Sequence, residues 1–415
     1  MQPDETSECF IRLHFCHKIR VLTYLGLAVR LVTWYNGNMI IKKVEMTMKH
    51  VQLMMKPASS NCNLRCRYCF YFDECENREV SSYGFMKEDV LEAVVKKALE
   101  AAEETCTFGF QGGEPTLAGL PFFEKFMEFT RKYKKPGTRL FFALQTNGTL
   151  LDENWAEFLA KNSFLVGISL DGTGEIHDRN RSEKAGKGTF RKVLKNAHML
   201  EKSGAEVNIL CVLTKQSARK IASIYNFLKK EGFFYHQYIP CLDPLGQERG
   251  KNPWSLTPEI YEEALKTLFD LWFEDMRKGI HVSVREFDNW LSMLKGYPPE
   301  ACSQVGRCSM QNIIEANGDI YPCDFYVLDQ YRVSNILDGE FQFFQGIPRE
   351  LPFFREEKGR GENCGGCRWY PLCRGGCRRD YVEEQEQRKN YFCQAYKGFF
   401  AYAIERMEWL TAYTR

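Results

Sequence analysis

Segments with the pattern of strands and of helices alternate between residues 51 and 239, and this alternation limits the fold more than any other feature of the sequence. Six short apolar runs are predicted strands: Val51–Pro57, Thr107–Phe110, Leu140–Leu144, Phe164–Leu170, Val207–Leu213 and Phe234–Ile239. Amphipathic segments between them are predicted helices: Lys87–Glu104, Leu120–Tyr133, Glu153–Lys161, Thr189–Ser203 and Ser217–Glu231. Strands that alternate with helices form a parallel sheet with right-handed crossovers. We therefore expect an α/β fold built on six β/α units.

Polar or glycine-rich residues follow each of these predicted strands. In barrels, the loops after the strands carry the chemistry. Here those loops contain a cysteine cluster and the sequences QGGEP, QTNG, SLDG and CLDPL, and we expect them to converge on one face. A long predicted helix, Pro258–Lys278, leads out of the last unit, and beyond about residue 300 the alternation stops.

Cysteine is the unusual residue in the composition, with 17 in 415 residues. An odd, large number in a long chain argues against a disulfide scaffold, which belongs to small secreted domains. Clustered C-x2-C spacings indicate metal binding instead, and they need reduced thiols, so we expect a cytoplasmic protein. The net charge of +2 gives no strong attraction to nucleic acid or to an anionic membrane.

The first 47 residues differ from the rest, because no Asp or Glu lies between Cys9 and Val44. The apolar run Val21–Val29 is too short to span a bilayer, which takes about 20 residues, and no signal-peptidase site follows it. We expect residues 1–47 to be a dispensable N-terminal extension before a start at Met46 or Met48. Membrane association and a real structural element are the alternatives.

The loop NCNLRCRYCFYF contains Cys62, Cys66 and Cys69 in a C-x3-C-x2-C pattern. A zinc site needs a fourth ligand, and no His follows at a suitable spacing. Three thiolates on a [4Fe–4S] cluster would leave one iron open for a substrate or cofactor. With Tyr68 before the last cysteine, the loop resembles that of the radical S-adenosylmethionine (SAM) superfamily, in which SAM binds the open iron. The resemblance implies a partial (β/α)6 radical SAM barrel.

The same resemblance implies a set of SAM contacts that would otherwise be read as ordinary structural residues. In that superfamily the GGEP backbone holds the SAM amino group, polar residues hold its carboxylate or ribose, and an apolar residue lines the adenine. The corresponding residues here are Tyr68, Gln111, Gly112, Gly113, Glu114, Ser169, Arg181 and Leu242.

Eight further cysteines follow the barrel, enough for two sites with four thiolates each. They form the patterns C-x5-C-x14-C and C-x2-C-x5-C-x3-C, with one more cysteine downstream. Zinc ribbons are the alternative, but the spacing resembles the SPASM extension, which carries two auxiliary [4Fe–4S] clusters. The resemblance implies crossed ligation, with Cys302, Cys308, Cys323 and Cys377 on one cluster and Cys364, Cys367, Cys373 and Cys393 on the other. The remaining six are predicted to be plain thiols: Cys9, Cys16, Cys75, Cys106, Cys211 and Cys241.

The motifs KPASSNCNLRCRYCFY, FQGGEPTLAG, LQTNGTL, CLDPL and YPCDFYVL together resemble those of anaerobic sulfatase-maturating enzymes. Those enzymes oxidise a Cys or Ser of a sulfatase, in a C/S-x-A/P-x-R motif, to Cα-formylglycine. By this resemblance Asp324, next to Cys323, is the predicted catalytic base, and Tyr71 and Gln111 lie near SAM and the substrate peptide. An alternative is a SPASM peptide maturase that forms thioethers or crosslinks. A non-catalytic zinc or iron-sensing module is a second alternative.

The predicted domains are an N-terminal extension (1–47), a radical SAM partial barrel (48–285) and a Cys-rich SPASM domain with little regular structure (286–415). The predicted cofactors are SAM and three [4Fe–4S] clusters. The predicted partners are an unfolded or nascent sulfatase polypeptide and an electron donor such as flavodoxin or ferredoxin. We expect a monomer that binds neither nucleic acid nor membrane. The sequence leaves the choice between a Cys and a Ser target open.

Overall fold

The computed structural model describes residues 48–338, 348–355, 361, 364–384 and 387–413, together with four earlier strands. These strands are β1 (Leu13–Phe15), β2 (Lys18–Leu25), β3 (Ala28–Tyr35) and β4 (Asn38–Lys43). They pair with one another in an antiparallel sheet of their own. The dispensability of residues 1–47 stays a prediction. Among the described residues, no helix has the length and apolar character needed to cross a membrane.

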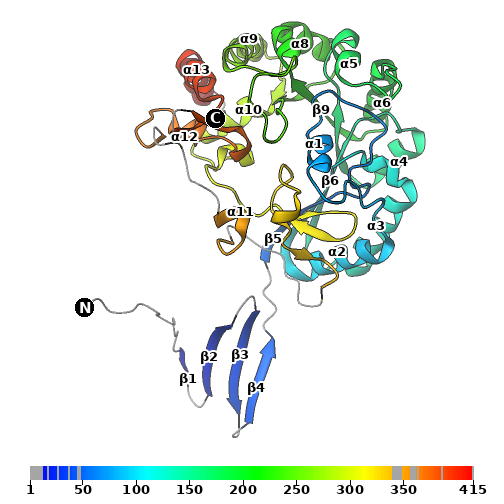
Figure 1. The fold of residues 1–415 in the computed structure, drawn as a ribbon, viewed down its shortest axis with the longest axis vertical. Coiled ribbons are helices and arrows are strands. Elements are labelled where there is room, and N and C mark those ends of the chain that lie inside the picture. Colours follow the sequence, from blue (N-terminus) through cyan, green and yellow to red (C-terminus); the bar gives the residue numbers. More distant parts are fainter. Residues whose placement is uncertain are drawn as a thin grey trace.

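The centre of the molecule is a sheet of six parallel strands that lie side by side in chain order (Figure 1). They are β5 (Met48–Met55), β6 (Ala102–Phe110), β7 (Arg139–Thr146), β8 (Phe164–Ser169), β9 (Glu206–Leu213) and β10 (Tyr235–Pro240). A short strand, β11 (Ser283–Val284), continues the sheet in parallel beyond β10. The six predicted β/α units are confirmed, and the loops after these strands meet at one edge of the sheet.

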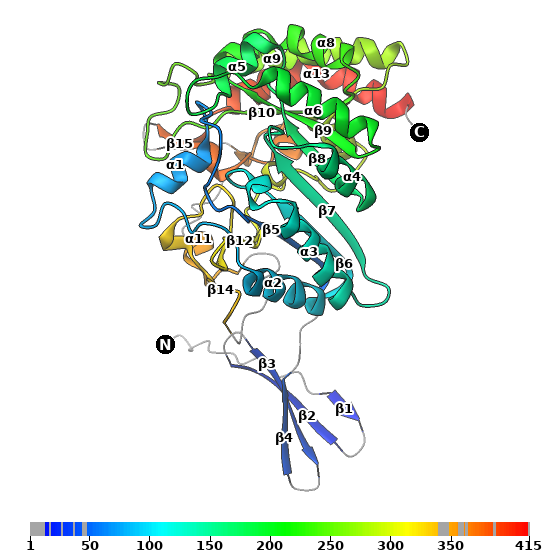
Figure 2. The same cartoon turned by 90° about the vertical axis from the view of Figure 1, so that its right-hand side faces the viewer.

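Helices cover the outer face of this curved sheet (Figures 1 and 2). They are α2 (Glu88–Ala101), α3 (Leu120–Tyr133), α4 (Glu153–Lys161), α5 (Gly174–Asn180), α6 (Phe190–Lys202), α7 (Lys215–Arg219), α8 (Ile221–Lys230) and α9 (Pro258–Arg277). The core lies between the two layers. The rings of Phe108 and Phe110 on β6 meet those of Phe123 and Phe126 on α3, with centroids 4.8–5.2 Å apart. Each such pair adds about 0.5–1.5 kcal/mol beyond the burial of its surface.

Two predicted helix boundaries are wrong. The helix predicted to run to Glu104 ends at Ala101, because the chain from Ala102 pairs with β5 from Met48 onward. Strand pairing there outweighs the helix propensity of the local sequence. The helix predicted from Ser217 to Glu231 is two helices, α7 and α8, because the backbone at Lys220 (φ −111°, ψ 17°) departs from the helical conformation and ends α7. A capping box of Thr214 and Ser217 starts α7.

The C-terminal region extends the same sheet at its other edge. Strand β12 (Ile313–Ile314) pairs in parallel with β5, and β13 (Asp319–Tyr321) and β14 (Ser334–Asn335) follow as antiparallel strands. The other elements are α10 (Arg285–Leu294), α11 (Pro352–Arg355), α12 (Tyr370–Cys373), β15 (Tyr381–Glu384), β16 (Gln387–Asn390) and α13 (Cys393–Tyr413). Apart from α10 and α13, these elements are short. Helix α13 packs on α9, where the rings of Phe399 and Phe269 lie 5.8 Å apart.

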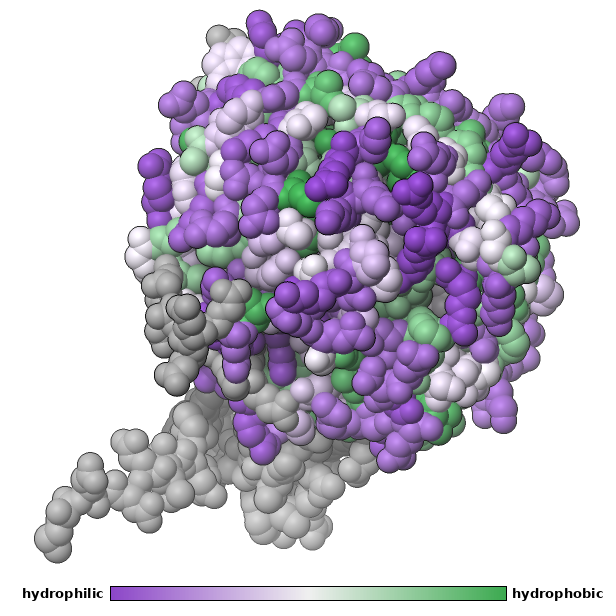
Figure 3. All heavy atoms as spheres, turned by 45° about the horizontal axis from the view of Figure 1, so that its top comes forward, coloured by the Kyte–Doolittle hydropathy of each residue, from purple (hydrophilic) through white to green (hydrophobic). Residues whose placement is uncertain are grey.

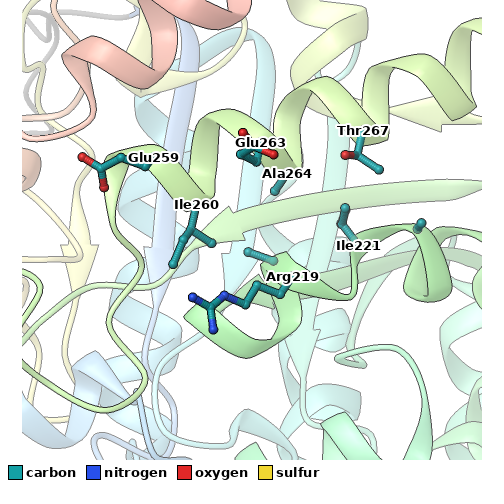
Figure 4. Close-up of a pocket in the computed structure, with 9 residues that line it drawn as sticks. Arg219, Ile221, Glu259, Ile260, Glu263, Ala264 and Thr267 are labelled. Carbon is teal, nitrogen blue, oxygen red and sulfur yellow. The ribbon is translucent and has the colours of Figure 1, made fainter.

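The coloured surface in Figure 3 is mostly hydrophilic, with apolar side chains in small scattered groups. One hollow of about 330 Å³ lies on the outside of the barrel between α9 and the helices α7 and α8. Arg219, Glu259 and Glu263 line it, and Figure 4 shows these side chains around it. None of the predicted site residues takes part in its lining.

Candidate active site

The three-cysteine loop lies directly after β5, and Cys69 precedes the first residue of α1 (Phe70–Glu76). All three thiols are partly buried. Burial raises the pKa of Cys62 to about 11 and that of Cys66 to about 12, and the neighbouring thiols add to both effects. Thiols that influence one another in this way lie close together. Their protonated form is favoured without a cation, and metal coordination reverses that preference.

The GGEP turn packs against this loop. Gly113 has φ +50°, and a Cβ there would lie 2.3 Å from the carbonyl oxygen of Asn61, so only glycine fits. Glu114 is buried and its carboxylate accepts hydrogen bonds from the hydroxyls of Thr116 (2.6 Å) and Thr146 (2.7 Å) and from the backbone N–H of Asn147 (2.7 Å). The Glu114 side chain therefore ties the loops after β6 and β7 together, which leaves the turn's backbone as the part that can meet a ligand.

Arg181 and Tyr68, two predicted SAM contacts, share a buried partner. Asp171, two residues after β8, accepts a 2.5 Å hydrogen bond from the Tyr68 hydroxyl and lies 3.1 Å from Arg181 Nε. Arg181 also lies near the three-cysteine loop. Its charge lowers the pKa of Cys66, although burial of the thiol raises that pKa by more. Asp171 thus fixes both side chains beside the loop.

Two further predicted SAM contacts lie at the same edge of the sheet. Ser169 ends β8 and accepts a 3.1 Å hydrogen bond from the side-chain amide of Gln145. Leu242 follows β10 and is partly buried.

Asp324 comes from the C-terminal region, yet it contacts residues of the barrel. Its Oδ2 accepts a 2.5 Å hydrogen bond from the Tyr71 hydroxyl and a 3.3 Å bond from Gln111 Nε2. Its Oδ1 is buried and lies 3.9 Å from Lys56 Nζ. Burial raises the pKa of Asp324, and Lys56 and the Tyr71 hydrogen bond oppose that rise. The structure therefore brings together the three residues predicted to lie near the substrate.

Lys56 is the site residue that the sequence analysis missed. It is 2% exposed, and its ammonium lies 3.5 Å from Glu74 Oε2 on α1 as well as near Asp324. Burial by itself lowers the pKa of Lys56. The nearby carboxylates of Glu74, Asp324 and Glu315 have the larger combined effect and raise this pKa above its ordinary value. The available signal was its position: it directly follows the first strand, where a charged side chain reaches the ligand-binding edge.

The eight C-terminal cysteines fall into two spatial groups. Burial raises the pKa of Cys323, and the thiols of Cys377, Cys308 and Cys302 raise it further. Burial likewise raises the pKa of Cys373 to about 11, with contributions from Cys393, Cys364 and Cys367. These are the same two sets that the resemblance implies. The second set lines a hollow of about 590 Å³.

The described cysteines form no disulfide, and they are not grouped around a single ion. Across the described part of the chain, no three His, Cys, Asp or Glu side chains are arranged to hold one ion. None of the fifteen described cysteines is in a disulfide. A [4Fe–4S] cluster binds each thiolate to a different iron, so its ligands stand farther apart than those of one zinc ion.

The chain is similar to known proteins over most of its length. A family model described as the radical SAM superfamily matches residues 57–228. A cysteine-type anaerobic sulfatase-maturating enzyme of Clostridium novyi (strain NT) is 46% identical over 365 residues, which is 88% of this chain and 98% of the relative. The chain belongs to the anaerobic sulfatase-maturating enzyme family.

Two further comparisons concern the type of target residue and the fold. A serine-type enzyme of Bacteroides thetaiotaomicron is 30% identical over 382 residues, covering 87% of this chain and 91% of the relative. The solved structure of native anSMEcpe with bound AdoMet and Cp18Cys peptide is 44% identical, with a TM-score of 0.81 over 88% of this chain and 100% of that chain. This chain is thus a radical SAM sulfatase-maturating enzyme, and the predicted fold class is confirmed.

Proposed function

We propose that this enzyme oxidises a cysteine, rather than a serine, of a sulfatase polypeptide to Cα-formylglycine. The observation that carries the reaction is the contact of Asp324, from the cysteine-rich region, with Tyr71 and Gln111 of the barrel. A carboxylate is thereby held at the edge of the barrel where SAM-binding residues gather. The choice of cysteine follows from the identity to cysteine-type relatives, 46% against 30% for a serine-type one.

The residues that would hold the cofactors are those predicted from the sequence. Cys62, Cys66 and Cys69 would bind the first [4Fe–4S] cluster, and the two groups of four cysteines would bind two auxiliary clusters. The GGEP backbone, Tyr68, Ser169, Arg181 and Leu242 would surround SAM. When bound, SAM and the clusters supply the radical that takes a hydrogen atom from the target Cβ and the acceptor for one electron.

Asp324 is then the base for the second proton. Oxidation of a cysteine side chain to a thioaldehyde removes two electrons and two protons, and the thiol proton needs an acceptor. Because Oδ1 is buried, Oδ2 is the oxygen of Asp324 that would receive this proton. Tyr71 and Gln111 hold that oxygen in place. The thioaldehyde then reacts with water to give the aldehyde and hydrogen sulfide.

The partners follow from this chemistry. The substrate is an unfolded or nascent sulfatase segment with a C-x-A/P-x-R motif, because a folded sulfatase would bury its target. An electron donor such as flavodoxin or ferredoxin reduces the first cluster. We propose a monomeric enzyme in the cytoplasm, where reduced thiols persist.

An anaerobic assay tests the proposal. The reconstituted enzyme is mixed with SAM, dithionite and a peptide containing C-x-P-x-R, and a matched peptide with Ser at the target position is assayed in parallel. Mass spectrometry should find formylglycine, formed faster from the Cys peptide. A thioether or carbon crosslink instead of an aldehyde would identify the enzyme as another kind of peptide maturase.

A further inference from the structure

Lys56 occupies a buried position between the two halves of the active site. Its side chain passes Gly112 so closely that a Cβ on that glycine would lie 2.5 Å from Lys56 Cε. Its ammonium lies 4.4 Å from the centre of the Tyr71 ring, 3.5 Å from Glu74 Oε2 and 3.9 Å from Asp324 Oδ1. The first glycine of GGEP thus provides the space through which this lysine reaches the base.

We propose that Lys56 is a positioning residue for the oxidation, because its ammonium holds Oδ1 of Asp324 and so turns Oδ2 toward the target thiol. This inference rests on the proposed role of Asp324 as the base. In this role, Lys56 ensures that removal of the hydrogen atom from the substrate is followed by formation of the product.

The hydrogen bonds of Asp324 support this assignment. Oδ2 is held by Tyr71 and Gln111, whereas Oδ1 has no hydrogen-bond donor among the residues that the structure describes. Among the residues that the structure describes, Lys56 is the cation that forms an ion pair with Asp324. A buried carboxylate oxygen without any partner is unfavourable, so loss of Lys56 would let the carboxylate rotate toward another donor.

Glu74 also contacts the lysine ammonium and is itself held in place. Its Oε1 accepts a 3.0 Å hydrogen bond from the amide of Val327, three residues after Asp324. Lys56 thus contacts Glu74 on α1 and Asp324 in the C-terminal region. Lys56 could instead serve only to neutralise the buried charge of Glu74. The experiment distinguishes this structural role from positioning of Asp324.

The experiment measures 5′-deoxyadenosine and formylglycine for each reconstituted variant, together with the KM for the peptide, the iron content and the thermal midpoint. For Lys56→Met we expect the rate of formylglycine formation to fall about 10- to 100-fold, the size of effect that a misplaced group produces. SAM cleavage, KM and iron content should stay close to wild type. The ratio of 5′-deoxyadenosine to formylglycine should rise accordingly.

The double variant Lys56→Met/Glu74→Gln separates the two readings. If Lys56 acts on Asp324, removing the charge of Glu74 leaves the reaction uncoupled. Recovery of a near wild-type ratio in the double variant would show that Lys56 is only a counter-ion and would overturn the inference. If Lys56→Met does not fold, the double variant can be assayed in its place. Removing both charges of a buried pair is tolerated better than removing one.

Arg78→Met is the matched control. Arg78 forms a buried 2.7 Å ion pair with Glu315 that joins the same two regions. We expect this variant to lower the thermal midpoint without changing the product ratio. Equal uncoupling in Arg78→Met would show that any weakening of this interface uncouples the reaction, and the role of Lys56 would fail.

Asp324→Asn, assayed in parallel, distinguishes failure of this inference from failure of the proposed function. If Asp324→Asn still forms product in proportion to SAM cleavage, the base is wrongly assigned. If Asp324→Asn is uncoupled and Lys56→Met is not, the base stands and only the positioning role of Lys56 is overturned.

Discussion

The three cysteines of the barrel and the eight of the C-terminal region reach their sites in different ways. Cys62, Cys66 and Cys69 lie within eight consecutive residues and belong to one loop, in which the Cys69 amide donates to the Cys66 carbonyl at 3.2 Å. The C-terminal groups draw on segments from Cys302 to Cys393. The first site is encoded locally, whereas the others exist only once distant segments have packed.

The predicted crossing of the C-terminal groups falls at an unusual stretch of backbone. Between Cys373 and Cys377 the chain has three successive positive φ angles, at Arg374 (50°), Gly375 (93°) and Gly376 (77°). Left-handed backbone is accessible mainly to glycine, so this turn reverses the chain sharply. Cys377 follows this turn, and its thiol raises the pKa of Cys323, which belongs to the other group. Neighbouring cysteines in sequence therefore belong to different groups.

The largest expected effect tests whether the three-cysteine loop and the C-terminal cysteines bind their clusters independently. Replacing Cys62, Cys66 and Cys69 together with Ala should abolish SAM cleavage, because no thiolate remains to hold the first cluster. The auxiliary clusters should persist, so the iron content should fall by about one third. Loss of nearly all the iron would mean that the two regions cannot assemble separately.

Asp324 connects the two regions, and its replacement gives the next largest effect. In Asp324→Asn we expect SAM cleavage and all clusters to remain while formylglycine formation falls about 10²–10⁴-fold, the usual contribution of a general base. Product quantified by mass spectrometry against 5′-deoxyadenosine checks this. A near wild-type rate of product formation would remove Asp324 from this role.

Pairs of cysteine variants test the crossing directly. If Cys302 and Cys377 share a cluster, Cys302→Ala/Cys377→Ala should lose no more iron than Cys302→Ala alone, about one third. Cys373→Ala/Cys377→Ala should lose about two thirds, since it affects both auxiliary clusters. The opposite ranking in iron analysis would mean that the cysteines are grouped in their sequence order.

The smallest expected effect concerns the barrel alone. Burial lowers the pKa of His236, on β10, to about 4, against 6.5 for an exposed His. Between these values the unfolded chain binds one more proton than the folded chain. His236 should therefore lose its stabilising contribution as the pH falls from 6.5 toward 4, by about 1.4 kcal/mol per pH unit.

Thermal midpoints at pH 7 and pH 5 check this effect. His236→Gln, which cannot titrate, should lose less stability on acidification than the wild type. Because both proteins carry the same clusters, any acid lability of the clusters cancels in the comparison. An equal loss in both proteins would mean that His236 does not contribute.

Much of the barrel could be predicted from the sequence. The helices Leu120–Tyr133 and Glu153–Lys161 have the predicted bounds, because amphipathic periodicity and turn residues act over a few neighbouring positions. The boundary at Ala102 could not be predicted in this way, since its pairing partner lies more than 50 residues earlier on β5. Spacing alone also left the grouping of the C-terminal cysteines open, and only the family resemblance implied it.

The sequence by itself determined the chemistry that is available: an open three-thiolate loop, eight further thiolates and a carboxylate beside Cys323. Only the tertiary structure decided which of these groups meet. Pairing of β12 with β5 brings the C-terminal region against the barrel, and this contact places Asp324 beside Tyr71, Gln111 and Lys56. The energy of a buried charge depends on its neighbours in space rather than along the chain, so the position of Lys56 after a strand could not reveal its partners Glu74 and Asp324.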